Sequence, residues 1–212
     1  ASVLNHKGYN IEVVLVGSEE SQSEESKVIW DEIKKSGIKY SIVTDIDSLD
    51  SVIHHFVEAD IIIDGLFGIG ITRPVEGYRQ GIISMINQSK ASVISIDVPS
   101  GLNADNGLVY GTAVKATHTL IVQHYKQGNI LGDARDYSGI MHLVEVGIFN
   151  PTTHIQYLLP KNEMKDIMVP RKHNTHKYDY GCVLTLGGSK GMMGAPILSA
   201  ISALKTGSGL SR

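Results

Sequence analysis

The chain has 212 residues and a formal net charge of -3, a length that suits one large domain or one domain with part of another. Its charges are scattered, so no basic stripe indicates a nucleic-acid partner, and no apolar run reaches the roughly 20 residues of a membrane span. The single cysteine, Cys182, excludes an internal disulfide and fits the reducing cytoplasm, where we expect the protein to act.

Strand and helix patterns alternate along the first two thirds of the chain. Short apolar runs rich in β-branched residues predict strands, and apolar residues three and four apart predict helices between them. Ser21 and Glu24 form a capping-box pattern before a helix whose apolar stripe is Val28, Ile29 and Ile33. This order predicts an α/β fold with a doubly wound, mainly parallel, Rossmann-like sheet. The expected strands are 11–16, 38–43, 61–63, 93–96, 119–122 and 143–146, with helices at 21–37, 49–57 and 78–86.

The composition changes at residue 151. Three prolines and a polar run predict a linker over residues 151–176, with one short helix at 162–168. A new strand, glycine loop and helix pattern follows over residues 177–212, and one such unit cannot bury a core alone. We therefore expect a first domain at 1–150, the beginning of a second α/β domain at 177–212, and cut ends on both sides.

The first candidate site is the loop that follows the strand at 61–63. Asp64 ends this strand, and ligands of doubly wound sheets bind beyond such carboxyl ends. Gly68 and Gly70 let the backbone approach a ligand or turn with a positive φ, and Arg73 offers a charged contact for phosphate. Arg73 replaces the third glycine of the dinucleotide fingerprint, so the standard Rossmann mode is not supported. A tight turn is the alternative.

The second candidate site follows the strand at 93–96. Asp97 lies beside a Pro–Ser–Gly turn, where a carboxylate could transfer a proton, bind a metal or bind a sugar hydroxyl. Its alternative role is to cap a turn. Asp64 and Asp97 end neighbouring strands with Ser100 close by, so their oxygens could begin a site for a hard cation.

Other reactive or aromatic residues indicate packing. His54 and His55 are adjacent on a helix, so we do not expect them to share a metal. Trp30 and Met85 lie in helical stripes and are predicted core residues. Cys182 lies in an apolar strand, where we expect a buried, inert thiol.

Several motifs in one order make the chain resemble the NAD(P)H-hydrate epimerase family over residues 1–150. Residues 176–181 and 187–195 then resemble the opening of the ADP-dependent NAD(P)H-hydrate dehydratase domain, which is ribokinase-like. The epimerase motifs are Asp64-Gly65-Leu66-Phe67-Gly68 with Gly70 and Arg73-Pro74, then Ser95-Ile96-Asp97-Val98-Pro99-Ser100-Gly101-Leu102, Gly111-Thr112-Ala113-Val114-Lys115-Ala116 and Lys126-x-Gly128.

The resemblance implies a substrate and a division of roles. The substrate is hydrated NADH or NADPH, whose R and S epimers the enzyme interconverts. Asp97 contacts it, while Asp64 and Ser100 help to hold a potassium ion. We hypothesise that Asp97 transfers the proton and that Lys126 orients the substrate or meets its charge, with a solvated loop lysine as the alternative. The implied substrate-binding loop is Gly68, Ile69, Gly70, Ile71, Thr72, Arg73 and Pro74.

The second domain and the assembly are also implied by resemblance. Ala195 matches a substrate-contacting position of the dehydratase domain, which uses ADP, with magnesium as a further candidate. The family's Asn-Asn-x-Gly-Gly-Asp-Gly loop and the later dehydratase nucleotide loop have no counterpart in this chain, so we expect little activity from it as given. The resemblance also implies that the protein assembles as a homo-oligomer.

Two other classes of function stay open. The same fold could serve as a non-catalytic nucleotide-binding module or scaffold. A sugar-kinase-like phosphotransferase is a third reading, because the dehydratase domain resembles that fold. Phosphoryl transfer from ATP, rather than dehydration with ADP, would distinguish it.

Overall fold

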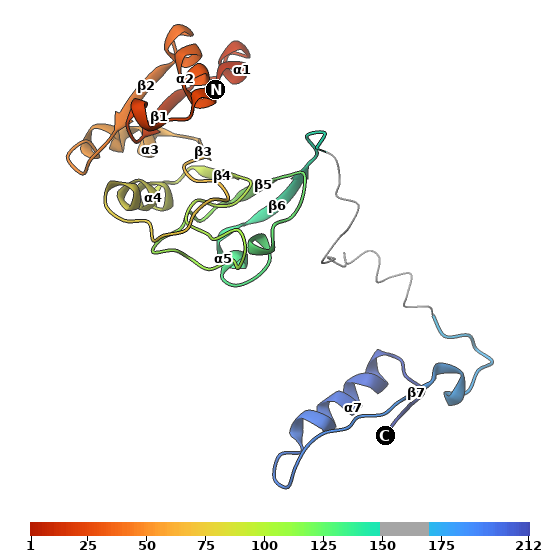
Figure 1. The fold of residues 1–212 in the computed structure, drawn as a ribbon. Coiled ribbons are helices and arrows are strands. Elements are labelled where there is room, and N and C mark those ends of the chain that lie inside the picture. Colours follow the sequence, from red (N-terminus) through yellow and green to blue (C-terminus); the bar gives the residue numbers. More distant parts are fainter. Residues whose placement is uncertain (149–169) are drawn as a thin grey trace. The chain divides into compact units, whose positions relative to one another are not determined.

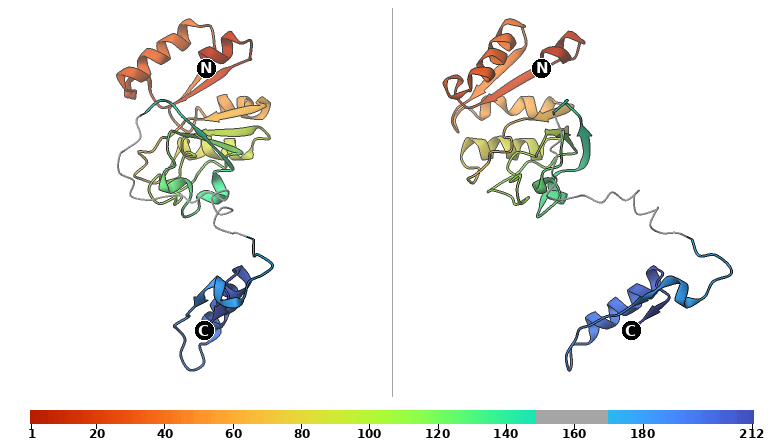
Figure 2. Two further views of the ribbon diagram at one scale, coloured as in Figure 1. Left: turned by 90° about the vertical axis from the view of Figure 1, so that its right-hand side faces the viewer. Right: turned by 45° about the vertical axis from the view of Figure 1, so that its right-hand side comes forward.

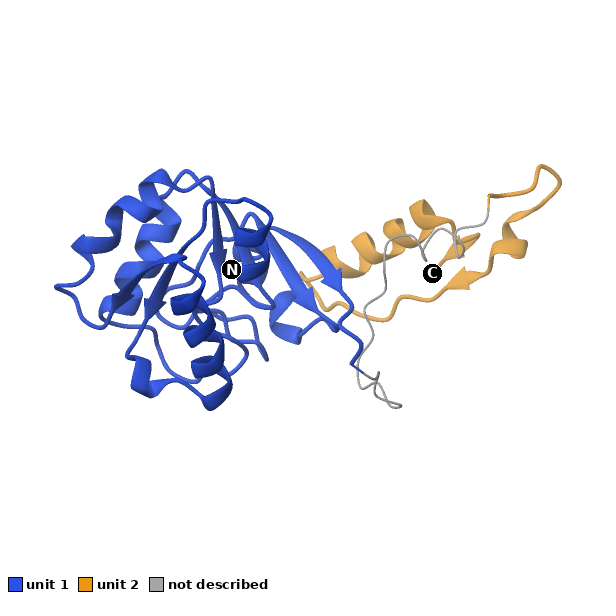
Figure 3. Ribbon diagram, turned by 90° about the horizontal axis from the view of Figure 1, so that it is seen from above, with its two compact units in different colours: residues 1–150 blue, residues 151–212 orange. Residues whose placement is uncertain are grey.

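The computed structural model describes residues 1–148 and 170–212. These belong to two compact units, Ala1–Asn150 and Pro151–Arg212, which Figure 3 colours separately. The helix expected at 162–168 lies outside the described residues.

The first unit begins with a short helix, α1, and a parallel strand pair, β1 and β2, joined by helix α2. The N-cap of α2 is Ser23, whose hydroxyl accepts a hydrogen bond of 3.2 Å from the Ser26 amide. Ser21, the predicted cap, instead ends a 3-10 turn, where its hydroxyl donates to the Ser18 carbonyl. The bounds are α1 Ser2–His6, β1 Glu12–Val16, the turn Glu19–Ser21, α2 Glu24–Lys35 and β2 Lys39–Val43.

Helix α2 buries a narrower stripe than its sequence predicts. Trp30 and Ile33 pack with Ile38 in a small core against β1 and β2, which confirms Trp30 as a core residue. Val28 and Ile29 are 62% and 58% exposed, although the periodicity places them in the apolar stripe. The reason is that a sheet of two strands covers only part of the helix surface.

Four parallel strands form the main sheet in the order β3-β4-β5-β6, which Figure 1 shows from orange to teal. The parallel α/β class is confirmed, but β1 and β2 form a separate two-stranded sheet in place of one continuous sheet. Periodicity specifies strands without specifying which edges pair. The bounds are 3-10 turn Asp50–Val52, α3 Ile53–Glu58, β3 Ile61–Asp64, α4 Tyr78–Gln88, β4 Ser92–Ile96, β5 His118–Val122, 3-10 turn Gln127–Asn129, α5 Ala134–Tyr137 and β6 Ile140–Val144.

The largest core joins α3 and α4 to strands of both sheets. Helix α4 lies along the β3–β6 sheet (Figure 2) and buries Ile82, Ile83 and Ile86 against Val93 of β4. Met85 packs at its margin, as predicted. This packing holds the carboxyl ends of β3 and β4, which carry the two candidate sites.

The second unit is a small strand–helix–strand arrangement. Strands β7 (Cys182–Val183) and β8 (Leu210–Ser211) pair in parallel, and α7 (Gly194–Thr206) follows a 3-10 turn at Lys177–Tyr180 and β7. Helix α7 has no buried residue. Cys182 is exposed, so the predicted buried thiol is wrong: β7 pairs with only one short strand, which leaves its side chains uncovered. Among the described helices, none is long and apolar enough to cross a membrane.

Candidate active site at the carboxyl ends of the parallel strands

Asp64 ends β3 as a buried carboxylate, with only 2% of the residue exposed. Its Oδ2 accepts hydrogen bonds from the Ser95 hydroxyl at 2.7 Å and the Ser100 amide at 2.9 Å. Its Oδ1 accepts from the Ser100 hydroxyl at 2.6 Å and the Leu66 amide at 3.2 Å. Asp64 therefore ties the loop after β3 to the turn after β4.

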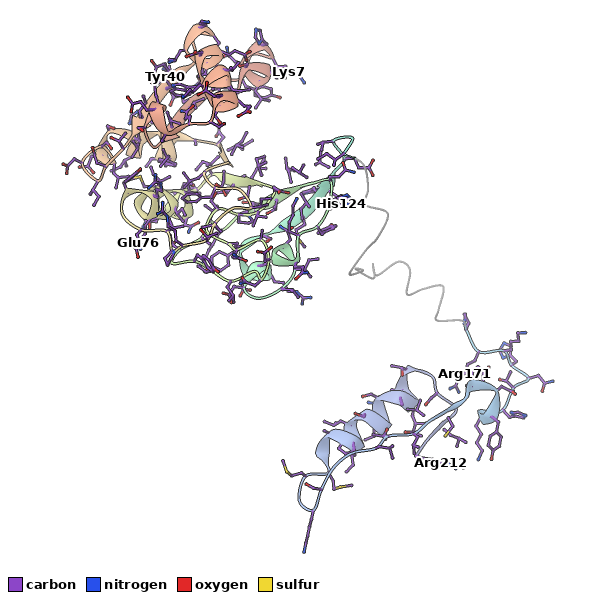
Figure 4. All side chains as sticks on the ribbon, in the orientation of Figure 1. Lys7, Tyr40, Glu76, His124, Arg171 and Arg212 are labelled. Atoms are coloured by element: carbon purple, nitrogen blue, oxygen red, sulfur yellow. The ribbon has the colours of Figure 1, made fainter. Side chains whose placement is uncertain are left out.

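Asp97 follows β4 with a backbone φ of 69°, in the left-handed region that disfavours a non-glycine residue. The Val98 amide donates to the Ile96 carbonyl at 2.9 Å, which closes a three-residue turn around Asp97. Gln123, at the end of the neighbouring β5, has a φ of 61° and a similar turn, closed by the His124 amide on the Val122 carbonyl at 2.7 Å. Figure 4 labels His124 at this side of the sheet. Two strained turns thus adjoin at the strand ends.

The Asp97 carboxylate meets the Lys126 ammonium. Lys126 Nζ donates to Asp97 Oδ1, and the same oxygen accepts from the Val122 amide at 3.0 Å. Lys126 Nζ also donates to the Val122 carbonyl at 2.9 Å, and its side chain is only 23% exposed. Lys126 is therefore a partly buried partner of Asp97, and the alternative of a solvated loop lysine does not describe it.

The two carboxylates have different hydrogen-bond partners. Asp64 is bonded by two serines and backbone amides, whereas Asp97 is bonded by Lys126 and the β5 backbone. Within the described residues, no three His, Cys, Asp or Glu side chains are grouped so that they could hold a metal ion. The turn at Asp97 directs its carboxylate toward β5, and the joint cation site stays a prediction.

The loop from Gly68 to Pro74 lies over the same strand ends. The Phe67 amide donates to the Ser100 hydroxyl at 2.8 Å, and Asn103 Nδ2 donates to the Ile71 carbonyl at 3.3 Å. Ile71 is buried, while Gly68, Ile69, Gly70, Thr72, Arg73 and Pro74 are exposed.

The two loop glycines have room around them. A Cβ built on Gly68 or Gly70 would meet nothing within 4 Å, and neither has a positive φ. The sequence offered two reasons for these glycines, a positive-φ turn or a close approach of a ligand. The structure therefore shows no positive-φ turn at these glycines, and the approach of a ligand stays a prediction.

Ala195 lies in the first turn of α7, exposed, in the second unit.

Two other features were missed by the sequence analysis. Ser95 lies within β4 and bonds Asp64, and Asn129 is buried beside Asp97. Elsewhere, His55 contacts the Glu12 carboxylate through Nδ1 and lies 3.1 Å from the Ser41 hydroxyl through Nε2. These residues are up to 43 positions apart, so no local pattern indicates their contacts.

The family model described as "YjeF-related protein N-terminus" matches residues 1–128. This chain belongs to that family. The match covers the candidate active site from Asp64 to Lys126 and stops one residue before Asn129.

Relatives of this chain carry the names of repair enzymes. It is 36% identical over 151 residues to the NAD(P)H-hydrate epimerase of Oenococcus oeni, covering 71% of this chain and 68% of that protein. It is 33% identical over 211 residues to the bifunctional NAD(P)H-hydrate repair enzyme Nnr of Thermofilum pendens, covering 99% of this chain. The chain spans 40% of the length of that bifunctional relative.

A solved structure has a similar fold. The crystal structure of yeast ynu0 matches 71% of this chain and 60% of that chain, with a TM-score of 0.56 and 17% sequence identity. At this identity the likeness supports the α/β fold alone.

Proposed function

We propose that the first unit of this chain is an epimerase domain that interconverts the R and S forms of hydrated NADH and NADPH. The observation that carries the proposal is the Asp97–Lys126 pair at the carboxyl ends of β4 and β5. Ligands of doubly wound sheets bind at this side. The relative from Oenococcus oeni, named NAD(P)H-hydrate epimerase, supports the substrate class, since it aligns over 151 residues.

The proposed chemistry moves one proton from the enzyme to the substrate and one proton back. The hydrated ring carbon carries a hydroxyl beside the ring nitrogen. The protonated form of Asp97 gives its proton to this hydroxyl, and the electron pair of the ring nitrogen expels it as water, which leaves an iminium. Water then adds to the other face of the iminium and gives one proton back to the Asp97 carboxylate. Asp97 is the proposed acid and base, and Lys126 holds its carboxylate and meets the charge of the substrate.

The loop from Gly68 to Pro74 is the proposed cradle for the dinucleotide. Its exposed glycines leave open space where a Cβ would otherwise stand, so backbone amides can approach phosphate oxygens. Arg73 is exposed and offers a planar, charged contact for a phosphate.

Potassium is a further part of the proposal, through Asp64 and Ser100. Their oxygens are ligands of the type that a hard cation takes. Among the described residues, Asp64 forms no salt bridge with Lys, Arg or His, so its buried charge is matched by neutral donors alone. A bound cation would neutralise this charge, and the Ser100 hydroxyl can rotate to present a lone pair.

Thermal unfolding in potassium chloride and in choline chloride at equal ionic strength tests the cation. We expect potassium to raise the midpoint with concentration in the wild-type protein, because a ligand that binds only the folded state stabilises it. Asp64→Asn should abolish the difference, and Asp105→Asn, which changes an exposed carboxylate, should keep it. Equal midpoints in both salts for the wild-type protein would contradict the site.

Epimer exchange of hydrated NADH, followed by chromatography, tests the main proposal. We expect Asp97→Asn in the full-length protein to slow exchange by about 100-fold or more, because general acid–base catalysis contributes about 10²–10⁴-fold. Asp105→Asn is the matched control and should exchange normally. Near-normal exchange by a folded Asp97→Asn variant would exclude Asp97 as the proton carrier. Absence of exchange in the folded wild-type protein would favour a nucleotide-binding module.

The second unit extends the proposal to a dehydratase. The alignment with the Thermofilum pendens bifunctional repair enzyme covers 99% of this chain, including residues 177–212. ADP and magnesium are the proposed ligands of the complete domain, with Ala195 near the substrate.

The location and assembly belong to the same proposal. A cytoplasmic location fits the single cysteine.

A homo-oligomer is supported by edge strand β6, where Ile140 is 60% and Leu143 is 48% exposed.

A further inference from the structure

Asn129 is a buried polar residue to which the proposed chemistry gives no role. It is 0% exposed, and its amide nitrogen Nδ2 donates to the Asp97 carbonyl at 3.0 Å. Its Oδ1 accepts a hydrogen bond of 2.8 Å from the Lys126 backbone amide. One side-chain amide thus connects the backbones of the two residues whose side chains form the ion pair.

The bond to Asp97 falls on the strained turn after β4. A non-glycine residue in the left-handed region costs free energy and persists only where its surroundings hold it. The Asp97 amide is fixed by the Leu120 carbonyl at 2.8 Å, and its carboxylate by Lys126 and Val122. Asn129 Nδ2 fixes the remaining polar group of the residue, the carbonyl.

The loop that carries Asn129 is itself held firmly. The Gly128 amide donates to the Ala104 carbonyl at 2.7 Å. A Cβ on Gly128 would lie 2.1 Å from the Asn103 carbonyl oxygen, so only glycine permits this approach. Asn129 therefore sits on a packed support rather than on a free loop.

We propose that Asn129 is a positioning residue for the Asp97–Lys126 pair. It holds the turn that directs the Asp97 carboxylate toward β5 and fixes the start of the Lys126 loop, so that carboxylate and ammonium meet. The inference rests on the proposed epimerase function, which supplies the reason for the pair. Asparagine suits the role because one group must donate to a carbonyl while the other accepts from an amide.

The kinetic test compares variants of the full-length protein. Asn129→Ala removes both bonds, and Asn129→Asp keeps the acceptor but loses the donor. Thr119→Val is the matched control: Thr119 is also 0% exposed, and its hydroxyl donates to the Ser138 carbonyl at 2.7 Å rather than to Asp97 or Lys126. All three remove a buried hydrogen bond.

We expect both Asn129 variants to lower kcat by about 10- to 100-fold with KM changed less than about threefold, because misplacing a reacting group affects the chemical step more than binding. Thr119→Val should leave kcat within about twofold of wild type while lowering the unfolding midpoint, which separates positioning from stability. Equal kcat losses in Thr119→Val and the Asn129 variants overturn the inference.

Crystal structures of the wild-type protein and Asn129→Ala give a readout that does not depend on activity. We expect Asp97 to leave the left-handed region, or its carboxylate to separate from Lys126 Nζ. An unchanged turn with an unchanged Asp97–Lys126 contact overturns the positioning role. Absence of epimer exchange in the wild-type protein overturns the proposed function instead, and the crystal structures still decide whether Asn129 holds the pair.

Discussion

Backbone strain at single residues is concentrated where the candidate active site lies. The two described non-glycine residues with positive φ, Asp97 and Gln123, follow neighbouring parallel strands. Each costs about 1–3 kcal/mol, which the fold must offset through the contacts around it. The sequence predicts Asp97 at a strand end from the apolar run before it. It does not predict the turn, because the bonds that hold the turn come from residues 23 to 32 positions away.

Gly101 provides a residue-scale prediction about the Pro–Ser–Gly turn. It has a φ of 99°, and a Cβ there would lie 1.9 Å from the Thr112 carbonyl oxygen. We expect Gly101→Ala to lower the free energy of unfolding by about 3 kcal/mol or more, since backbone strain and a steric clash act together. Urea denaturation measures this loss.

Gly37 is the matched control for that substitution. Its φ is 74°, but a Cβ there would meet nothing within 4 Å. We expect Gly37→Ala to cost only about 1 kcal/mol, from strain alone. Similar losses for both variants would show that the close approach at Gly101 contributes little.

At the scale of elements, the residue that caps a helix and the face that it buries depend on contacts with other segments, which local sequence patterns do not predict. Both Ser21 and Ser23 precede α2, and the sequence predicts Ser21 as its cap. The structure caps the helix with Ser23, because Ser21 is already bonded within the preceding turn. The first five strands were confirmed more closely, since an apolar β-branched run is a local signal. The sixth, expected at 143–146, begins three residues earlier, at Ile140–Val144, where it pairs with β5.

The contact of His55 with Glu12 joins α3 to β1 and gives a pH-dependent prediction. The hydrogen bond from His55, with a smaller contribution from Lys39, lowers the pKa of Glu12 from its ordinary value of 4.5. Because the folded-state pKa is lowered, the stabilisation is present above the unfolded-state pKa and is lost as the pH falls through the folded-state pKa. This pair should therefore stabilise the fold at neutral pH and cease to do so in acid.

Glu12→Gln tests this linkage. We expect the variant to be less stable than wild type by up to about 1 kcal/mol at pH 7, because the pair is partly exposed to solvent. The difference should shrink as the pH falls below 4.5 and vanish below the lowered folded-state pKa of Glu12, where the wild-type carboxyl loses its charge. Guanidinium chloride denaturation across this pH range measures it, and Glu20→Gln, at an exposed position, is the control. A difference that does not change with pH would exclude the ionic contribution.

At the scale of the whole molecule, the two units differ in the core that supports them. Helix α4 buries three isoleucines, whereas α7, of similar length, buries none of its residues. We expect the amides of α7 to exchange with solvent far faster than those of α4 in this 212-residue chain, since local opening is easy where few side chains are buried. Hydrogen–deuterium exchange with mass spectrometry makes the comparison within one sample. Equal protection of the two helices would show that α7 gains a core by some other contact.

The sequence by itself determined the α/β class, the strands and the placement of Asp64, Asp97 and Ser100 at strand ends, because each depends on a few adjacent residues. Only the tertiary structure decided how these residues are paired. Asp64 bonds serines 31 and 36 positions away, Asp97 bonds Lys126, and Asn129 joins the two halves of that pair. The physical reason is that a hydrogen bond between segments forms only after strands have paired and the chain has turned, and no local pattern encodes that geometry.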